Sequence, residues 1–126
     1  MEHILFADGN LKKISWAIKT DDSIDEQIRE HVEQYLDKVT SEQSKYIAIH
    51  VGIFWSIGRF IIKNEDTVKV MLDSKKMFEH LSQKKDSPNE FIQNRTWFLN
   101  ELIKQRKLKV HYHLIKPEEN LAKKLI

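Results

Sequence analysis

Two aspartates stand where two short apolar segments end. Asp8 follows Ile4–Ala7, and Asp73 follows Val68–Leu72. Both segments are rich in strand-forming residues, and carboxylates at the carboxyl ends of adjacent strands hold catalytic metal ions in many α/β folds. Each aspartate alone has an ordinary structural explanation, because Asp-Gly favours a turn and Asp-Ser favours the start of a helix. What the pair does depends on the elements that position it.

Length and composition limit the class of protein. The 126 residues suit one domain spanning positions 1–126, and 32% charged with 40% hydrophobic residues is typical of a globular chain. The absence of cysteine excludes disulfides and thiolate metal sites. The amino terminus lacks the pattern of a signal peptide, and Tyr46–Ile62, the longest apolar-rich segment, is too short and polar to span a membrane. We therefore expect a cytoplasmic protein without a membrane segment.

Periodicity and turn signals outline the elements. They predict, in chain order, strands over residues 4–7 and 13–19, a disputed segment over 24–39, a helix over 46–63, a strand over 67–72, helices over 74–83 and about 87–107, a strand over 108–115 and a terminal helix over 118–126. Ser87-Pro88-Asn89-Glu90 predicts a capping box at the start of the long helix. Its expected packing residues are Phe91, Trp97, Phe98, Leu99, Leu102 and Ile103.

The segment over residues 24–39 admits two interpretations. Apolar residues recur at helical spacing from Ile24 to Val39, which favours an amphipathic helix. The competing interpretation is a strand over about Glu30–Val39, with Val32 and Leu36 on one face. Local periodicity favours the helix.

Four pieces of the chain, in this order, resemble the ribonuclease H family. Asp8-Gly9 is similar to the end of the family's first strand, and Tyr35–Ala48 resembles its third strand, Thr-Asn-Asn turn and first helix. Leu72-Asp73-Ser74 resembles the end of the fourth strand, and His113–Ala122 resembles the last strand and the asparagine that opens the last helix. The resemblance implies an α/β fold with a mixed five-stranded sheet, the first three strands antiparallel and strands one, four and five parallel, with helices on both faces. It also implies that residues 24–39 end in the third strand.

The resemblance also implies a catalytic site, from which this chain departs. Enzymes of the family cleave the RNA strand of an RNA–DNA hybrid with two magnesium ions held by four carboxylates. Asp8 and Asp73 match the first and third, whereas the second and fourth positions carry Lys45 and Lys124. An ammonium group offers no oxygen ligand, so the two aspartates and two lysines are expected to cluster at one end of the sheet, with at least one Asp–Lys pair within hydrogen-bonding distance. We predict that the site holds no metal. If it holds Mg²⁺ or Mn²⁺, Asp8 and Asp73 are the ligands, with Glu42, Glu118 or Glu119 as a rescue.

Other residues give weaker signals. His111 and His113 lie on one face of a predicted strand without a third ligand at suitable spacing, which favours an ordinary strand surface. Phosphate contacts need only positive charge within reach. The candidate nucleic-acid contacts are Lys12, Lys13, Lys75, Lys76, Lys84 and Lys85. The same lysines are equally explained as a solvated surface.

Three functional hypotheses follow. The first is a catalytically degenerate ribonuclease H-like protein that binds an RNA–DNA hybrid or another duplex without cleaving it. The second is an active metal-dependent ribonuclease H with a reshaped metal site. The third is a structural or protein-interaction module, with a protein partner or a second copy of the chain as its partner.

Overall fold

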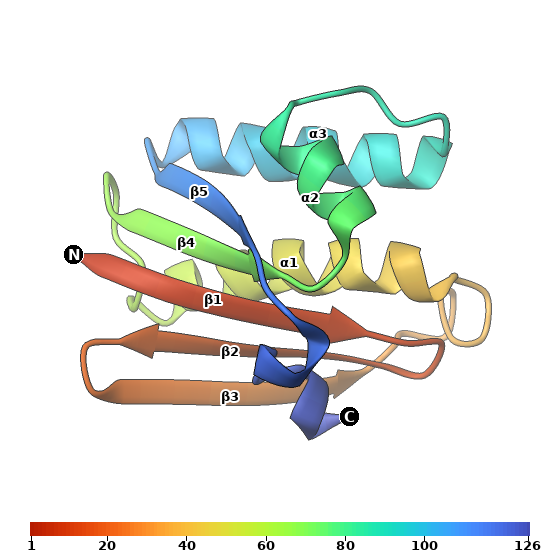
Figure 1. Ribbon diagram of the computed structural model, residues 1–126, viewed down its shortest axis with the longest axis horizontal. Helices are drawn as coiled ribbons and strands as arrows, with labels where there is room; N and C mark the ends of the chain where they lie inside the picture. Colours follow the sequence, from red (N-terminus) through yellow and green to blue (C-terminus); the bar gives the residue numbers. More distant parts are fainter.

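The computed structural model describes residues 1–126 and contains one mixed five-stranded sheet of order β3-β2-β1-β4-β5 (Figure 1). Strands β1, β2 and β3 pair antiparallel, and β4 pairs parallel with both β1 and β5. This confirms the predicted α/β fold with a ribonuclease H-like sheet. The strands are β1 (Glu2–Gly9), β2 (Lys13–Thr20), β3 (Ser23–Glu30), β4 (Thr67–Leu72) and β5 (Lys109–Leu114).

The chain also forms three α-helices: α1 (Ser41–Gly58), α2 (Lys75–Ser82) and α3 (Glu90–Gln105). Helix α1 packs on β1 and β2, and α3 packs on α1. Thr40 caps α1 in a capping box with Gln43, so the helix begins before its apolar residues, and it ends at Gly58 rather than at residue 63. Helix α3 is capped by Asn89 and not by the predicted Ser87. No helix of the structure has the length and hydropathy needed to cross a membrane.

The third strand is antiparallel to the second, as the resemblance implies, but it lies earlier in the chain than predicted. It covers Ser23–Glu30, whereas most of the predicted strand over Glu30–Val39 is turn. Thr20 pairs with Ser23, which leaves a two-residue hairpin turn in which Asp21 has a φ of 53°. β3 is exposed over most of its length, with Ile24 44% exposed, so it lacks the alternation that marks a half-buried strand. The helical interpretation of the same segment is wrong.

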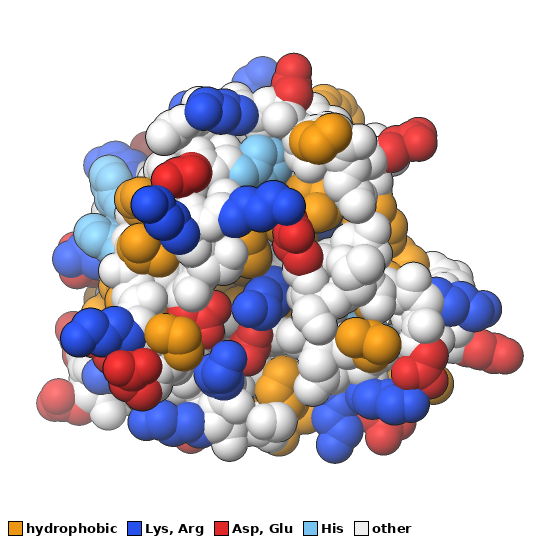
Figure 2. Space-filling view, turned by 45° about the vertical axis from the view of Figure 1, so that its right-hand side comes forward, with side chains coloured by type: hydrophobic (Ala, Val, Ile, Leu, Met, Phe, Trp, Pro, Cys, Tyr) orange, Lys and Arg blue, Asp and Glu red, His pale blue; other side chains and the backbone are white.

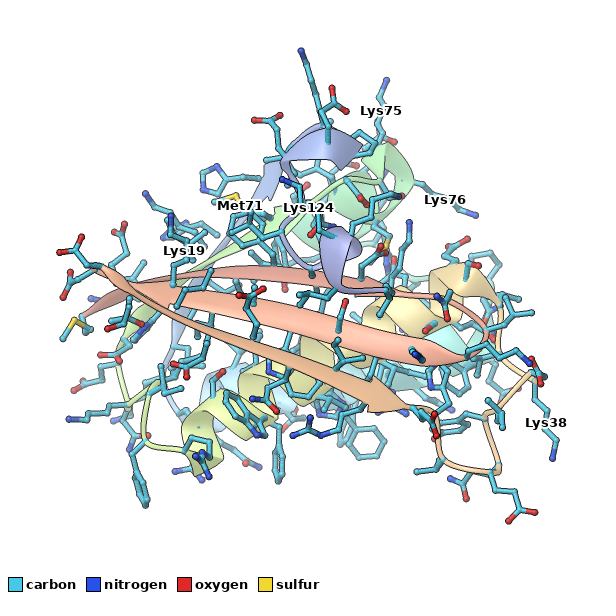
Figure 3. The ribbon with its side chains drawn as sticks, turned by 90° about the horizontal axis from the view of Figure 1, so that it is seen from below. Lys19, Lys38, Met71, Lys75, Lys76 and Lys124 are labelled. Carbon is cyan, nitrogen blue, oxygen red and sulfur yellow. The ribbon has the colours of Figure 1, made fainter.

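The terminal α-helix predicted over residues 118–126 is also wrong. The chain forms two 3₁₀ turns, η1 (Pro117–Glu119) and η2 (Lys123–Leu125), across the face of the sheet opposite α1 (Figure 3). Asn120 interrupts the helix because its backbone is extended and its side chain accepts a hydrogen bond from Ala122 N. Ser15 of β2 donates to Ala122 O at 2.7 Å and fixes the turns on the sheet.

The core lies between the sheet and α1. Trp16 and Leu5 are fully buried, and Gly52 of α1 lets them approach, since a Cβ there would lie 3.2 Å from Trp16 Cβ. At Gly58, by contrast, nothing lies within 4 Å of the position that a Cβ would take. Trp97 and Phe98 of α3 were predicted to pack inward and are instead 57% and 56% exposed.

Candidate functional site: an aspartate and lysine cluster

Asp8 and Asp73 lie at the same edge of the sheet. β1 and β4 are parallel neighbours, so their carboxyl ends lie at the same edge, where Asp8 is the penultimate residue of β1 and Asp73 follows β4. Both side chains are buried, being 7% and 5% exposed. Gly9 has no side chain and therefore lets the first turn of α1 approach this edge, whereas a Cβ at this position would collide with Ser44. The close approach places Lys45 beside the two aspartates.

The Lys45 ammonium lies between the two carboxylates. Its Nζ is 3.9 Å from Asp8 Oδ1 and 3.7 Å from Asp73 Oδ1, and its side chain is 25% exposed. These distances are within ion-pair range but longer than a hydrogen bond. The expected Asp–Lys hydrogen bond is therefore wrong, whereas the predicted position of Lys45 beside both aspartates is confirmed.

The second lysine of the cluster is Lys123 and not the predicted Lys124. Lys123 Nζ lies 3.9 Å from Asp73 Oδ2, whereas Lys124 is exposed and forms no ion pair. The difference follows from the 3₁₀ geometry: Lys123 N donates to Asn120 O, and residues three apart lie on the same side of such a turn. The prediction assumed an α-helix, in which the fourth residue after Asn120 returns to that side.

Asn120 ties the carboxyl-terminal turns to both central strands. It is fully buried, and its Nδ2 donates to Ala7 O and to Asp73 Oδ2, each at 3.1 Å. The Asp73 carboxylate is thus held by a neutral donor and faces two ammonium groups. The resemblance identified this asparagine only as the opening of a helix.

The two aspartates differ in their electrostatic surroundings. Burial raises the pKa of Asp8 above its ordinary value, and the nearby charge of Asp73 adds to this effect. The Gly9 backbone, Lys45 and Lys123 act in the opposite direction without cancelling it. Asp8 Oδ1 is also buried without any hydrogen-bond partner. The cluster therefore holds one carboxylate that is incompletely stabilised.

The ligand set differs from the one that the resemblance implies. No group of three or more His, Cys, Asp or Glu side chains is arranged to hold a metal ion. Glu42 pairs with Lys76 at 3.3 Å, and Glu119 accepts a hydrogen bond from Lys116 N, so these glutamates have other partners. Two carboxylates facing two ammonium groups do not fit a pair of magnesium ions, which need several oxygen ligands.

Most of the candidate nucleic-acid lysines lie near this edge. Lys12 and Lys13 lie at the turn after β1, where Lys12 forms an exposed ion pair with Asp37 at 2.8 Å. Lys75 and Lys76 open α2 and project outward (Figure 3). On the face that Figure 2 shows, basic and acidic side chains are interspersed and no large acidic patch remains.

Two further pairs of candidate residues lie elsewhere. Lys84 and Lys85 follow α2, and Lys84 lines a hollow toward β5 with Val110. His111 and His113 are both exposed on β5.

Comparisons with known proteins identify the fold. No family profile matches the sequence, and no curated protein matches it. Among solved structures, the N-terminal RNase H domain of a Mycobacterium tuberculosis protein, solved as a fusion with maltose-binding protein, superposes with a TM-score of 0.78. The match has 16% identity and covers 99% of this chain and 95% of that chain.

Two further structures support the same assignment. RNase H1 from the halophilic archaeon Halobacterium salinarum has a TM-score of 0.72, with 13% identity over 94% of this chain and 87% of that chain. LC11-RNase H1 in complex with an RNA/DNA hybrid has a TM-score of 0.71, with 15% identity over 98% of this chain and 92% of that chain. The sheet order, the helices and these superpositions together show that the chain has a ribonuclease H-like fold.

Proposed function

We propose that this chain is a catalytically silent ribonuclease H-like protein that binds a nucleic-acid duplex, preferably an RNA–DNA hybrid, without cleaving it. The observation that carries the proposal is the Lys45 ammonium between Asp8 and Asp73, with Lys123 on the other side of Asp73. Positive charge from the protein stands where the family resemblance implies metal ions. Metal-assisted attack on a phosphodiester needs divalent ions that are held by several oxygen ligands. Two aspartates beside two lysines do not supply such a ligand set.

Charge neutralisation also supports binding without metal. Four bare carboxylates would repel a phosphate backbone, whereas two aspartates and two lysines carry no net charge. Exposed lysines at the same edge, such as Lys75 and Lys76, can contact phosphates without reading bases. A structural neighbour was solved in complex with an RNA/DNA hybrid, which supports hybrid as the first substrate to test.

The test uses a short fluorescently labelled RNA–DNA hybrid, with RNA and DNA duplexes of the same sequence as competitors. We expect binding in EDTA without any divalent ion, a steep loss of affinity with added salt, and intact RNA after incubation with Mg²⁺ or Mn²⁺. Lys75→Ala with Lys76→Ala should weaken binding about tenfold, since each phosphate contact contributes to the salt-dependent term. Lys19→Ala is the matched control, because Lys19 is exposed at the far end of β2 (Figure 3).

Two outcomes would overturn the proposal. Cleavage that Asp73→Asn abolishes would establish an active enzyme with a reshaped metal site. Absence of binding to every duplex at low salt would leave the protein-interaction module, including a homodimer, for which solution mass is the next measurement.

A further inference from the structure

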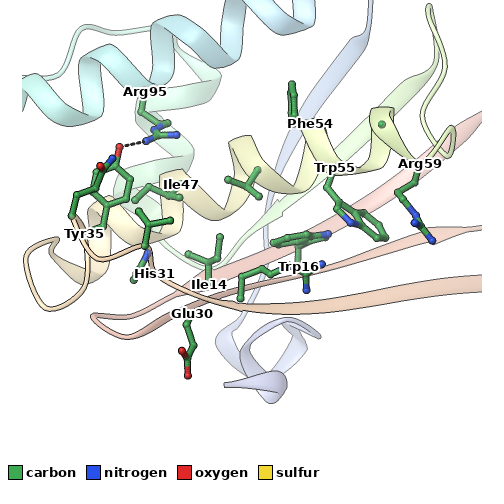
Figure 4. Close-up of a pocket in the computed structure, with 15 residues that line it drawn as sticks. Ile14, Trp16, Glu30, His31, Tyr35, Ile47, Phe54, Trp55, Arg59 and Arg95 are labelled. Carbon is green, nitrogen blue, oxygen red and sulfur yellow. Dashed lines mark hydrogen bonds between the residues drawn. The ribbon is translucent and has the colours of Figure 1, made fainter.

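A groove separate from the aspartate and lysine cluster runs along α1 on the side of β2 and β3 (Figure 4). Its volume is about 720 Å³, within the range of small-molecule sites. Its apolar wall includes Ile14, Ile47, Val51, Phe54 and Trp55. None of the clustered aspartates and lysines lines it, so the groove is a site in its own right.

Three arginines from three different elements line the groove: Arg29 of β3, Arg59 after α1 and Arg95 of α3. Each guanidinium lies over an aromatic ring, at 5.5 Å from the ring centre of Trp16, 5.6 Å from that of Trp55 and 5.8 Å from that of Tyr35, respectively. The ring contacts position these charges without neutralising them.

No arginine of the chain forms an ion pair with a carboxylate, since every ion pair in the structure uses a lysine, a histidine or the amino terminus. Glu30 is the one acidic residue that lines the groove. Arg59 also makes no side-chain hydrogen bond, which leaves all its donors for a ligand. The groove thus combines an apolar wall with uncompensated positive charge.

Trp16 and Arg95 differ in how their hydrogen-bond donors are satisfied. Trp16 is fully buried, and its Nε1–H has no hydrogen-bond acceptor. Arg95 is held by Tyr35 Oη at 3.1 Å and by His50 Nδ1 at 3.2 Å. Burial, together with the charge of Arg95, lowers the pKa of His50 and keeps its ring neutral as an acceptor for the guanidinium. The arginine donors of the groove therefore suit a ligand that supplies acceptor oxygens.

We infer that this groove binds a small amphipathic anion, with a ring-containing apolar body and a carboxylate or phosphate group. The body lies against Ile47, Val51 and Trp55, and the anionic group pairs with the guanidinium of Arg59. Arginine is suited to this role because its planar fork donates two parallel hydrogen bonds to either kind of anion. The inference does not depend on the proposed nucleic-acid function.

The indole N–H signals in a ¹H–¹⁵N NMR spectrum test this inference directly. The chain has three tryptophans, of which Trp16 and Trp55 line the groove and Trp97 does not. The probes are 2-naphthoate, 2-naphthyl phosphate and the neutral 2-naphthamide, which share one apolar body. We expect saturable shifts of the Trp16 and Trp55 signals with at least one anion, little change at Trp97, and binding of the amide about tenfold weaker.

Substitutions separate charge recognition from apolar binding. Arg59→Gln should weaken binding of the anion about tenfold and leave binding of the amide unchanged. Arg106→Gln is the matched control, because Arg106 is an exposed arginine outside the groove, and it should change neither. Equal affinity for anion and amide, an Arg59→Gln variant that binds like the parent protein, or no saturable shift at Trp16 and Trp55 would each overturn the inference.

Discussion

The parallel strands β1 and β4 have buried carboxylates at both ends, and the two ends hold them differently. At the amino end, the Asp66 carboxylate accepts from His3 Nε2 at 2.8 Å and from Lys63 N at 2.9 Å. His3 is fully buried, and its other ring nitrogen hydrogen-bonds to Thr20 at 2.6 Å. Burial acts to raise the pKa of Asp66, but the contacts with His3, Lys63 and the amino terminus outweigh it and lower the pKa.

At the carboxyl end, no contact between an aspartate and a lysine is shorter than 3.7 Å. Asp8 Oδ1 has no hydrogen bond, and burial raises the pKa of this carboxyl group. An ion pair that serves only stability is expected to have short, saturated contacts, as at Asp66. The looser cluster around Asp8 therefore has the character of a site whose geometry is not optimised for stability.

The largest expected effect is at the amino end. Asp66→Ala should lower the free energy of unfolding by about 3 kcal/mol, because it leaves His3 buried without its partner. Urea unfolding at neutral pH measures the change. Glu2→Gln is the control, since the Glu2–Lys69 pair is exposed and should contribute little. If Asp66→Ala lowers the free energy of unfolding no more than Glu2→Gln does, the carboxylate at the amino end is not held more firmly than an exposed ion pair.

The next effect has the opposite sign and depends on pH. Asp8→Asn should raise the free energy of unfolding at pH 7 by on the order of 1 kcal/mol, because ionisation of Asp8 costs stability in the folded state. The pKa of Asp8 is raised on folding, so this cost is present above the folded pKa and disappears below the ordinary value of 3.8, where both states are protonated.

Asp66 should show the reverse dependence. The pKa of Asp66 is lowered on folding, so its ionised carboxylate adds to the free energy of unfolding above the ordinary pKa of 3.8. This stabilisation is lost as the pH falls through the pKa of the folded state. Unfolding measured across acid pH for both variants separates the two cases. A destabilising Asp8→Asn substitution at pH 7 would mean that the lysines more than compensate for burial.

The smallest effect is expected on the surface. Lys12→Ala should change stability by less than about 0.5 kcal/mol, because Lys12 and Asp37 are 65% and 51% exposed although their charged atoms are 2.8 Å apart. Thermal unfolding of the variant tests this expectation. A larger loss would show that the turn after β1 is coupled to the cluster.

The sequence predicted some of these features and missed others for physical reasons. Strand β4 has the predicted bounds, because its apolar alternation and flanking turns are local signals. The carboxyl-terminal turns were missed because Asn120 is fixed by Ala7 and Asp73, which are distant in the sequence. That error moved the predicted lysine from Lys123 to Lys124.

The groove could not be predicted from local patterns. Its arginines come from three elements that are far apart in the sequence, and β3 is polar along most of its length. Lys45, by contrast, was located through the resemblance, because the first turn of α1 has the same relation to Asp8 that the family pattern implies.

The proposed function requires that Lys45 and Lys123 stand where the family resemblance implies metal ions. Calorimetric titration of Mn²⁺ into the parent protein, Lys45→Glu, Lys123→Asp and the double variant tests it most directly, with circular dichroism to verify folding. We predict no binding to the parent protein, weak binding to each single variant, and clear binding to the double variant, because shared ligands make the effects non-additive. Binding of Mn²⁺ to the parent protein that Asp73→Asn abolishes, or no binding to the folded double variant, would show that the two lysines do not occupy metal positions.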